Sequence, residues 1–238
     1  MTKRTRTALV ALWLLSALLL VVLFVRPEST TSSKLLTLCC LASLLSAPFV
    51  LLWKRRRIRI ALSAAVAVAL LLFLLPGRTR SPDELTDAYL THLRAFDGTH
   101  YVWGGENHRG IDCSGLVRVS LIEASLERAF TSADASLLRQ AATLWWFDAS
   151  AQALGEGYRG WTTEILRSPS LRTIDPSLLR RGDLAVTADG THVLAYLGDA
   201  TWIQADPVPM RVHFDRVGEG SGWFGVPVVI WRWTALSP

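Results

Sequence analysis

Gly110-Ile111-Asp112-Cys113-Ser114-Gly115-Leu116-Val117 is the stretch that decides the fold of this chain. Asp112 is a residue type that accepts hydrogen bonds from the free amides of a helix N-terminus, so a helix is predicted to begin at Cys113. A cysteine in the first helical turn has a lowered pKa, because the backbone dipole stabilises the thiolate, and the thiolate is the nucleophile. Gly115 removes a side chain that would block approach to the sulphur, and the same amides are placed to stabilise an oxyanion.

The other two cysteines, Cys39 and Cys40, lie inside an apolar run and cannot pair with Cys113. A lone thiol in an oxidising compartment is either buried and inert or kept free for chemistry. Cysteine usage alone leaves both alternatives open.

A nucleophilic cysteine needs a base from elsewhere in the fold. His192 is the histidine that starts a predicted strand, directly after the tight turn at Asp189-Gly190. Considered by itself it fits a structural role equally well. The other four histidines are interpreted as surface or structural residues: His92, His100, His108 and His213.

Around the Cys113 helix, helices come first and strands follow. The apolar spacing predicts a helix from Pro82 that stops near Gly98, and a further helical stretch over roughly Ser132 to Leu154. From Leu184 the pattern changes to strands, which are predicted at residues 184–187, 192–197, 201–205, 210–214 and 226–233. This order is typical of an α+β domain with an antiparallel sheet.

The chain has 238 residues, half of them hydrophobic, and a mean hydropathy of +0.29. The excess lies in three runs, 8–25, 35–53 and 58–75, each near the roughly 20 residues that cross a hydrocarbon core. The first run is long and ends in Val25-Arg26-Pro27 without a small-residue cleavage site, so we expect it to be retained as a membrane helix.

Basic residues orient these three transmembrane helices. Eight lie on the side of the N-terminus and of residues 54–59, and four lie on the other side. Because basic residues stay inside, the N-terminus is predicted to be cytoplasmic. A linker at 76–81 and a domain at 82–238 then lie outside the cytoplasm.

The formal charge of +5 does not indicate nucleic acid. After residue 60 the chain has fifteen basic and nineteen acidic residues, a net charge of −4. The exported part therefore lacks the basic surface that binds a polyphosphate.

Four ordered motifs together resemble the NlpC family of papain-like cell-wall cysteine peptidases. They are Tyr101-Val102-Trp103-Gly104-Gly105, Asp112-Cys113-Ser114-Gly115-Leu116-Val117, Arg181-Gly182-Asp183-Leu184, and His192-Val193 with Tyr196-Leu197-Gly198. The resemblance covers roughly residues 85–215. It implies a papain-like fold and hydrolysis of peptide bonds in peptidoglycan stems, commonly between D-glutamate and a diamino acid.

The resemblance also implies roles for particular residues. Cys113 corresponds to the nucleophile, His192 to the base, and Gln204 to the third polar residue that orients the imidazole. The positions that match residues lining the substrate cleft are Tyr101, Asp112 and Ser114. No metal or cofactor is implied.

The chain departs from the family pattern at two places. The stretch between Cys113 and His192 is longer than usual, with an insertion near 130–160 that contains Trp145-Trp146-Phe147. Gln204 stands where histidine is usual, although an amide can also accept a hydrogen bond from the imidazole.

Strand alternation provides a separate argument that Gln204, and not Asp206, is the residue that orients His192. If residues 198–200 form a three-residue hairpin loop, Leu194 faces Gln204, and Gln204 lies diagonally across from His192 on the same face. Asp206 would then sit opposite His192, near the end of its strand.

The resulting hypothesis is a cysteine peptidase in the bacterial inner membrane, with its domain on the extracytoplasmic side. Its partners would be peptidoglycan stem peptides and the lipid bilayer, and nucleic acid is excluded. Two alternatives remain. One is a non-catalytic scaffold that holds a membrane partner through the aromatic insertion, and the other is an amidase or acyltransferase using Cys113 and His192.

Overall fold

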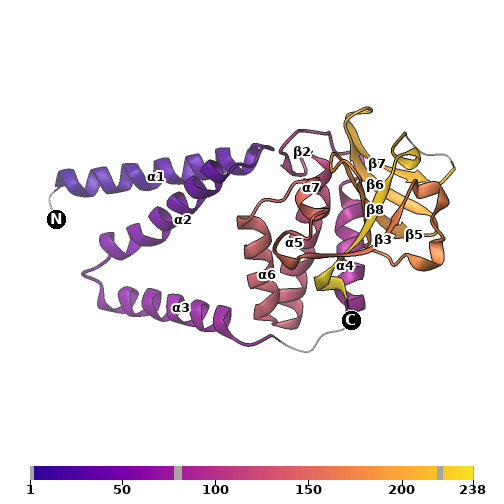
Figure 1. Ribbon diagram of the computed structural model, residues 1–238. Helices are drawn as coiled ribbons and strands as arrows, with labels where there is room; N and C mark the ends of the chain where they lie inside the picture. The colour runs from indigo at the N-terminus through magenta and orange to yellow at the C-terminus, as the bar shows by residue number, and fades with distance from the viewer. Residues whose placement is uncertain (1–2, 78–81, 219–221, 238) are drawn as a thin grey trace.

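Three long helices extend from one side of a helix-and-sheet domain (Figure 1). The computed structural model describes residues 3–77, 82–218 and 222–237, so residues 78–81 of the predicted linker lie outside the description. The helices are α1 Lys3–Val25, α2 Thr31–Leu51 and α3 Arg56–Leu74. Each is long and apolar enough to cross a membrane, which confirms the three predicted spans.

The domain places most of its helices before its sheet. The helices are α4 Pro82–Ala95, α5 Cys113–Ser132, α6 Ala135–Trp146 and α7 Ala151–Leu154. The strands are β1 Glu106–Asn107, β2 Gly110–Ile111, β3 Thr162–Ser168, β4 Leu184–Thr187, β5 Val193–Gly198, β6 Thr201–Asp206, β7 Arg211–Arg216 and β8 Val228–Trp233. The short 3-10 helices are η1 Tyr158–Gly160, η2 Leu171–Thr173, η3 Pro176–Leu178, η4 Gly222–Gly225 and η5 Thr234–Leu236.

Six of these strands form one antiparallel sheet in the order β3-β8-β4-β5-β6-β7. The predicted α+β class is therefore confirmed. β3 was not predicted. It is an edge strand whose side chains are mostly exposed, so it lacks the apolar alternation of a half-buried strand.

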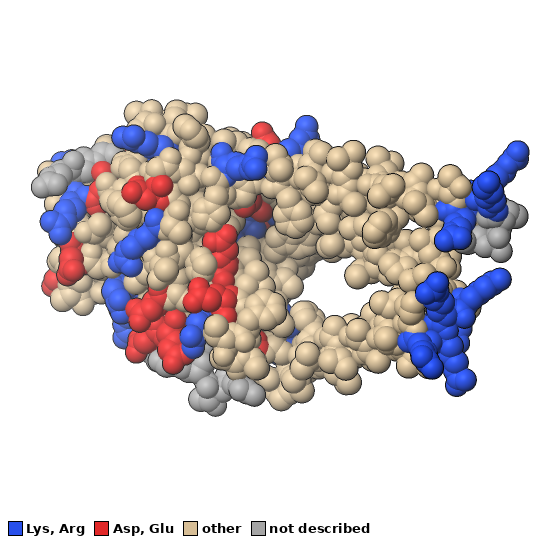
Figure 2. All heavy atoms as spheres, turned by 180° about the vertical axis from the view of Figure 1, so that it is seen from behind, with Lys and Arg blue, Asp and Glu red and all other residues tan. Residues whose placement is uncertain are grey.

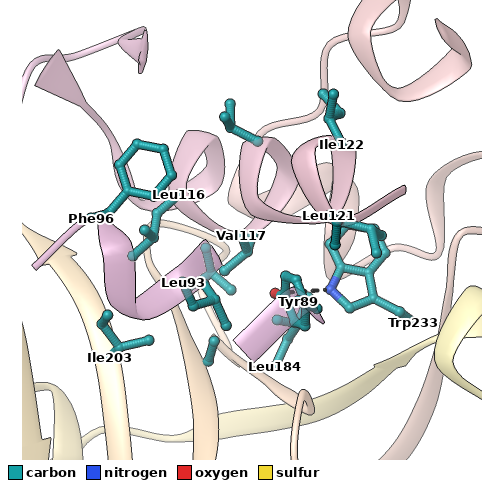
Figure 3. Close-up of a cluster of buried hydrophobic side chains, with 14 of the residues drawn as sticks. Tyr89, Leu93, Phe96, Leu116, Val117, Leu121, Ile122, Leu184, Ile203 and Trp233 are labelled. Carbon is teal, nitrogen blue, oxygen red and sulfur yellow. Dashed lines mark hydrogen bonds between the residues drawn. The ribbon is translucent and has the colours of Figure 1, made fainter. Parts of the chain in front are cut away.

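The main core lies between the sheet and helices α4 and α5 (Figure 3). Tyr89 and Leu93 from α4 meet Leu116 and Leu121 from α5, and all four side chains are at most 1% exposed. Trp233 of β8 closes this cluster and donates from Nε1 to the Tyr89 hydroxyl at 3.2 Å. The cluster fixes α5, and hence its N-terminus, against the sheet.

The opposite face of the sheet has a smaller apolar cluster of its own. Leu171 of η2 and Phe224 of η4 pack there against Tyr196 and Trp202 from the sheet. The domain thus has helices on one face of the sheet and 3-10 segments on the other.

The helix predicted over Ser132 to Leu154 is wrong as a single element, because polar caps divide it. Asp134 accepts a hydrogen bond from the amide of Ser136 and starts α6. The Ser150 hydroxyl accepts one from Ala153 and starts α7. A side-chain oxygen that binds a free amide at a helix start favours a new helix at that point.

The predicted hairpin loop is also wrong in length, although the strand register is right. Asp199 and Ala200 alone form the turn, both with positive φ, of 50° and 57°. Gly198 pairs with Thr201, and an irregularity follows before the pairs Tyr196–Trp202 and Ala195–Ile203, which have the predicted register. The extra residue at the bulge compensates for the shorter loop.

Candidate active site

Asp112 starts the helix that carries Cys113, as predicted. Its Oδ1 accepts hydrogen bonds from the Gly115 amide at 2.6 Å and from the Ser114 hydroxyl at 2.9 Å. Its Oδ2 accepts the amide of Gly104 at 2.8 Å. One carboxylate therefore caps α5 and holds the preceding loop beside Cys113.

The structure requires glycine at position 115 for a different reason from the one expected. A Cβ atom at this position would lie 2.4 Å from the carbonyl oxygen of Gly105. Glycine therefore allows close contact between the α5 N-terminus and the Gly104-Gly105 loop, and its role is packing.

A cavity of about 580 Å³ opens beside Cys113. Residues that line it include Tyr101, Trp103, Asp112, Cys113, Ser114 and Thr191. The three residues predicted to line a cleft are thus all at its wall. We call this cavity the Cys113 cleft.

The Cys113 thiol is not ionised in the free protein, contrary to the expected low pKa. The side chain is 6% exposed, and burial raises the pKa of the Cys113 thiol to about 12, with a further contribution from the negative charge of Asp112. Amides of Val193, Ser114 and Cys113 itself act in the opposite direction. The predicted helix effect is present, but desolvation outweighs it.

His192 precedes β5, between Thr191, which lines the Cys113 cleft, and Val193, the first residue of β5. Val193 bonds through its backbone amide to the Cys113 thiol and lowers the pKa of that thiol. His192 is 1% exposed, and its backbone amide donates to the Thr187 hydroxyl at 3.0 Å. Burial lowers the pKa of the His192 imidazole, while the Gln204 hydrogen bond and the charge of Asp206 partly oppose this effect. The imidazole is therefore neutral at neutral pH.

Gln204 contacts His192 directly. Its Oε1 lies 2.7 Å from His192 Nε2, and its Nε2 donates to Oδ2 of Asp215. A carboxylate accepts hydrogen bonds only, so the amide nitrogen must face Asp215 and the amide oxygen must face the imidazole. It follows that His192 Nε2 bears the proton and that Nδ1 is the basic nitrogen.

A second group of side chains surrounds the imidazole. Trp223 stacks on His192 with ring centroids 4.2 Å apart and an interplanar angle of 19°. Trp223 Nε1 donates to Asp206 Oδ1 at 3.2 Å, and Asp206 Oδ2 lies 3.3 Å from His213 Nε2. His213 Nδ1 lies 3.5 Å from Asp215 Oδ2. Asp206 therefore orients residues around His192 and does not bond to it.

Residues 98–223 match the NlpC/P60 family, and they make up more than half of the chain. This chain belongs to that family. Solved structures similar to this NlpC/P60 protein show low identity. An NlpC/P60 family protein from Bacillus cereus ATCC 10987 is 17% identical with a TM-score of 0.41, aligned over 66% of this chain and 41% of that one. This chain thus spans less than half the length of the Bacillus cereus protein.

Two further structures are peptidoglycan hydrolases. RipB from Mycobacterium tuberculosis is 18% identical with a TM-score of 0.39, aligned over 62% of this chain and 64% of that one. The NlpC/P60 domain of SagA is 22% identical with a TM-score of 0.37, aligned over 61% of this chain and 97% of that one. No curated protein matches the chain.

Sequence reasoning about this NlpC/P60 protein missed Trp223, which stacks on His192, and also Asp215 and His213, which belong to the polar network behind it. His213 pairs with Gln204 across β6 and β7, so extending the predicted hairpin by one strand would have found it. Trp223 lies in η4, and no local pattern places it on the imidazole. Among the described residues, no group of three or more His, Cys, Asp or Glu side chains is arranged to hold a metal ion.

Proposed function

We propose that this NlpC/P60 protein is a membrane-anchored cysteine peptidase that hydrolyses peptidoglycan stem peptides outside the cytoplasm. The observation that carries the proposal is the contact of His192 with Gln204 beside the Cys113 cleft. Gln204 holds the neutral imidazole with Nδ1 unprotonated, and Val193, the residue after His192, donates its backbone amide to the Cys113 thiol that needs a base.

The thiol loses its proton during attack, because burial keeps it neutral beforehand. Cys113 Sγ attacks the carbonyl carbon of the scissile amide while its proton passes to His192 Nδ1. His192 then protonates the leaving nitrogen, the C–N bond breaks, and a thioester to Cys113 remains. His192 next removes a proton from water, whose oxygen attacks the thioester, releasing a carboxylic acid and restoring the thiol.

The N-terminus of α5 provides electrostatic stabilisation for this reaction. The amides of Cys113 and Ser114 already point toward the sulphur and favour negative charge there. Free helix amides placed where charge develops also stabilise a tetrahedral oxyanion, without the cost of reorganising solvent.

Substrate recognition is proposed for Tyr101, Asp112 and Ser114. Asp112 already accepts three hydrogen bonds from the protein, so its contribution is mainly to hold Ser114 and the Gly104 loop at the cleft wall. Tyr101 keeps its hydroxyl proton and serves as a donor, because burial raises the pKa of Tyr101. The bond between D-glutamate and the diamino acid is the proposed scissile bond.

The charge distribution supports an outward-facing domain in a bacterial inner membrane. Lys and Arg gather at the helix ends farthest from the domain (Figure 2). These ends are the start of α1 and the connection between α2 and α3 (Figure 1). Basic ends of membrane helices remain in the cytoplasm, so residues 1–75 would form the membrane region and residues 82–238 the exported domain.

Incubation of the full chain in detergent with defined muropeptides, followed by mass spectrometry, tests the reaction and the bond together. We expect two fragments, split after D-glutamate, whose masses add up to the mass of the substrate plus one water. Cys113→Ala should give no products while retaining the native circular dichroism spectrum. Unchanged muropeptides with the native chain would contradict the proposal and favour a scaffold.

A further inference from the structure

The loop between α1 and α2, residues 26–30, lies against the loop that forms one side of the Cys113 cleft. Three hydrogen bonds join the two loops: Ser29 N to Gly104 O at 2.9 Å, Glu106 N to Pro27 O at 2.8 Å, and Asn107 Nδ2 to Arg26 O at 2.6 Å. Gly104 is also the residue whose amide binds Asp112. The membrane hairpin thus contacts the backbone that positions the nucleophile.

An ion pair joins α2 to the wall of the cleft. Lys34, in the first turn of α2, places Nζ 3.4 Å from Oε1 of Glu106, and the two side chains are 3% and 10% exposed. Arg118 binds the same carboxylate and also Asp148 at 2.8 Å. The last three residues of this cluster, Glu106, Arg118 and Asp148, all line the cleft.

The insertion near 130–160 makes a second contact between the domain and the membrane helices. Arg139 of α6 donates to the carbonyl oxygens of Phe73 and Leu75 at 2.6 and 2.8 Å, at the end of α3. α6 therefore lies on the side of the domain that faces the membrane helices (Figure 1). This position assigns a role to the insertion: it holds the domain against α3 while the 26–30 loop holds it against α1 and α2.

The length of α2 sets the height of the cleft above the hydrocarbon core. The apolar run at 35–53, most of which lies in α2, has 19 residues, which at 1.5 Å each span about 28 Å, close to the thickness of that core, and Lys34 directly precedes it. Lys34 and its partner Glu106 consequently lie at the level of the lipid headgroups. Trp103, which lines the cleft, is 81% exposed, and tryptophan prefers this interfacial layer.

We propose that the substrate of the Cys113 cleft is a stem peptide attached to a membrane lipid, in preference to the finished wall polymer. The inference rests on the proposed peptidase function. The cleft opens at headgroup level, and contacts at both α2 and α3 keep the domain there. A peptide carried on a lipid remains in this layer, so its effective concentration at the cleft is high.

The test uses the full chain reconstituted in vesicles with one stem-peptide sequence in three forms. The peptide is free, bound to lipid at the headgroup, or bound to lipid through a long flexible polyethylene glycol spacer. We expect kcat/KM for the headgroup-bound form to exceed that of the long-spacer form by about tenfold, because a long tether dilutes the peptide away from the surface. Equal rates, or faster cleavage with the long spacer, would overturn the inference.

Arg139→Gln is the variant that loosens the domain from α3. Arg139 does not line the cleft, so cleavage of the free peptide should be unchanged. The preference for the headgroup-bound form should fall several-fold, because the domain then leaves the surface more often. An unchanged preference would contradict the role assigned to α6.

A second measurement does not depend on activity. In a chain whose three cysteines are replaced by alanine, Trp103→Cys is compared with Leu178→Cys, which is 56% exposed in η3, across the sheet from the helices. A maleimide attached directly to a lipid headgroup should label position 103 at least tenfold faster than position 178. A soluble maleimide should label both at similar rates.

The two measurements separate the possible failures. If no form of the peptide is cleaved, the proposed function fails, and the labelling ratio alone decides whether the cleft lies at the membrane. If the free peptide is cleaved but position 178 is labelled as fast as position 103, the peptidase function stands and the lipid-bound substrate is rejected.

Discussion

The side-chain amide of Gln204 donates from Nε2 to Oδ2 of Asp215, and this contact decides which end of the amide faces His192. With the nitrogen committed to Asp215, the oxygen accepts from His192 Nε2. Asp215 therefore selects the imidazole tautomer without touching the imidazole.

Gln204→Ala is expected to lower kcat by about ten- to a hundredfold and to change KM little, because it removes orientation of the base and no substrate contact. Asp206→Asn should lower kcat by a smaller factor, since Asp206 contacts Trp223 and His213 and not His192. Steady-state kinetics on a muropeptide compare the two. The reverse order would make Asp206 the third residue of the site.

Asp215→Asn is expected to lower kcat by about tenfold, because an asparagine can donate as well as accept and no longer fixes the Gln204 amide. If Asp215 acts through Gln204, Asp215→Asn should lower kcat no further in a chain that already has Gln204→Ala. Additive losses in the double variant would assign Asp215 another role. Arg216→Gln, at the neighbouring exposed position, is the matched control.

The thiol of Cys113 is expected to react slowly with iodoacetamide at neutral pH, because burial raises its pKa to about 12. The alkylation rate should rise with pH without reaching a plateau below about pH 10. Mass spectrometry of the modified peptide measures the rate against an unperturbed cysteine peptide. Faster labelling than the peptide at pH 7 would indicate a thiolate stabilised by His192 in the free enzyme.

The pH dependence of kcat/KM should have its acid limb below pH 6.5. Burial lowers the pKa of His192 in the folded protein, so the imidazole stays neutral and basic until the pH falls below its unperturbed value. Stability follows the same sign: it is retained above about pH 6.5 and is lost as the pH falls from there through the lowered pKa, since the unfolded chain binds a proton first. An acid limb centred above pH 7 would contradict this environment for His192.

Membrane topology is tested with a reporter that is active only outside the cytoplasm. A fusion at the C-terminus should be active. A fusion after Arg57 should be inactive, because Arg57 lies among the basic residues that connect α2 and α3, and such basic connections remain in the cytoplasm. Both fusions must be present at equal levels by immunoblot. The opposite pattern would place the domain on the side that lacks its substrate.

Local patterns were sufficient where the deciding interaction is local. Asp112 caps α5 through neighbours two and three residues away, and Gln204 reaches His192 across one hairpin, so spacing and strand alternation predicted both. The thiol pKa depends on burial, which no spacing reveals. Likewise β3 forms by pairing with β8, whose paired residues come 60 to 71 positions later, and its own side chains are mostly exposed.

The buried pair of Lys34 and Glu106 has a consequence for biosynthesis. The two residues are 72 positions apart, so α2 is made and inserted well before the carboxylate that neutralises its lysine exists. Until Glu106 is in place and β1 has formed, Lys34 has no carboxylate partner, and its ammonium stays hydrated in the headgroup layer. The contacts of the membrane hairpin are therefore completed only after the domain that follows it in the sequence has begun to fold, although the hairpin itself is made first.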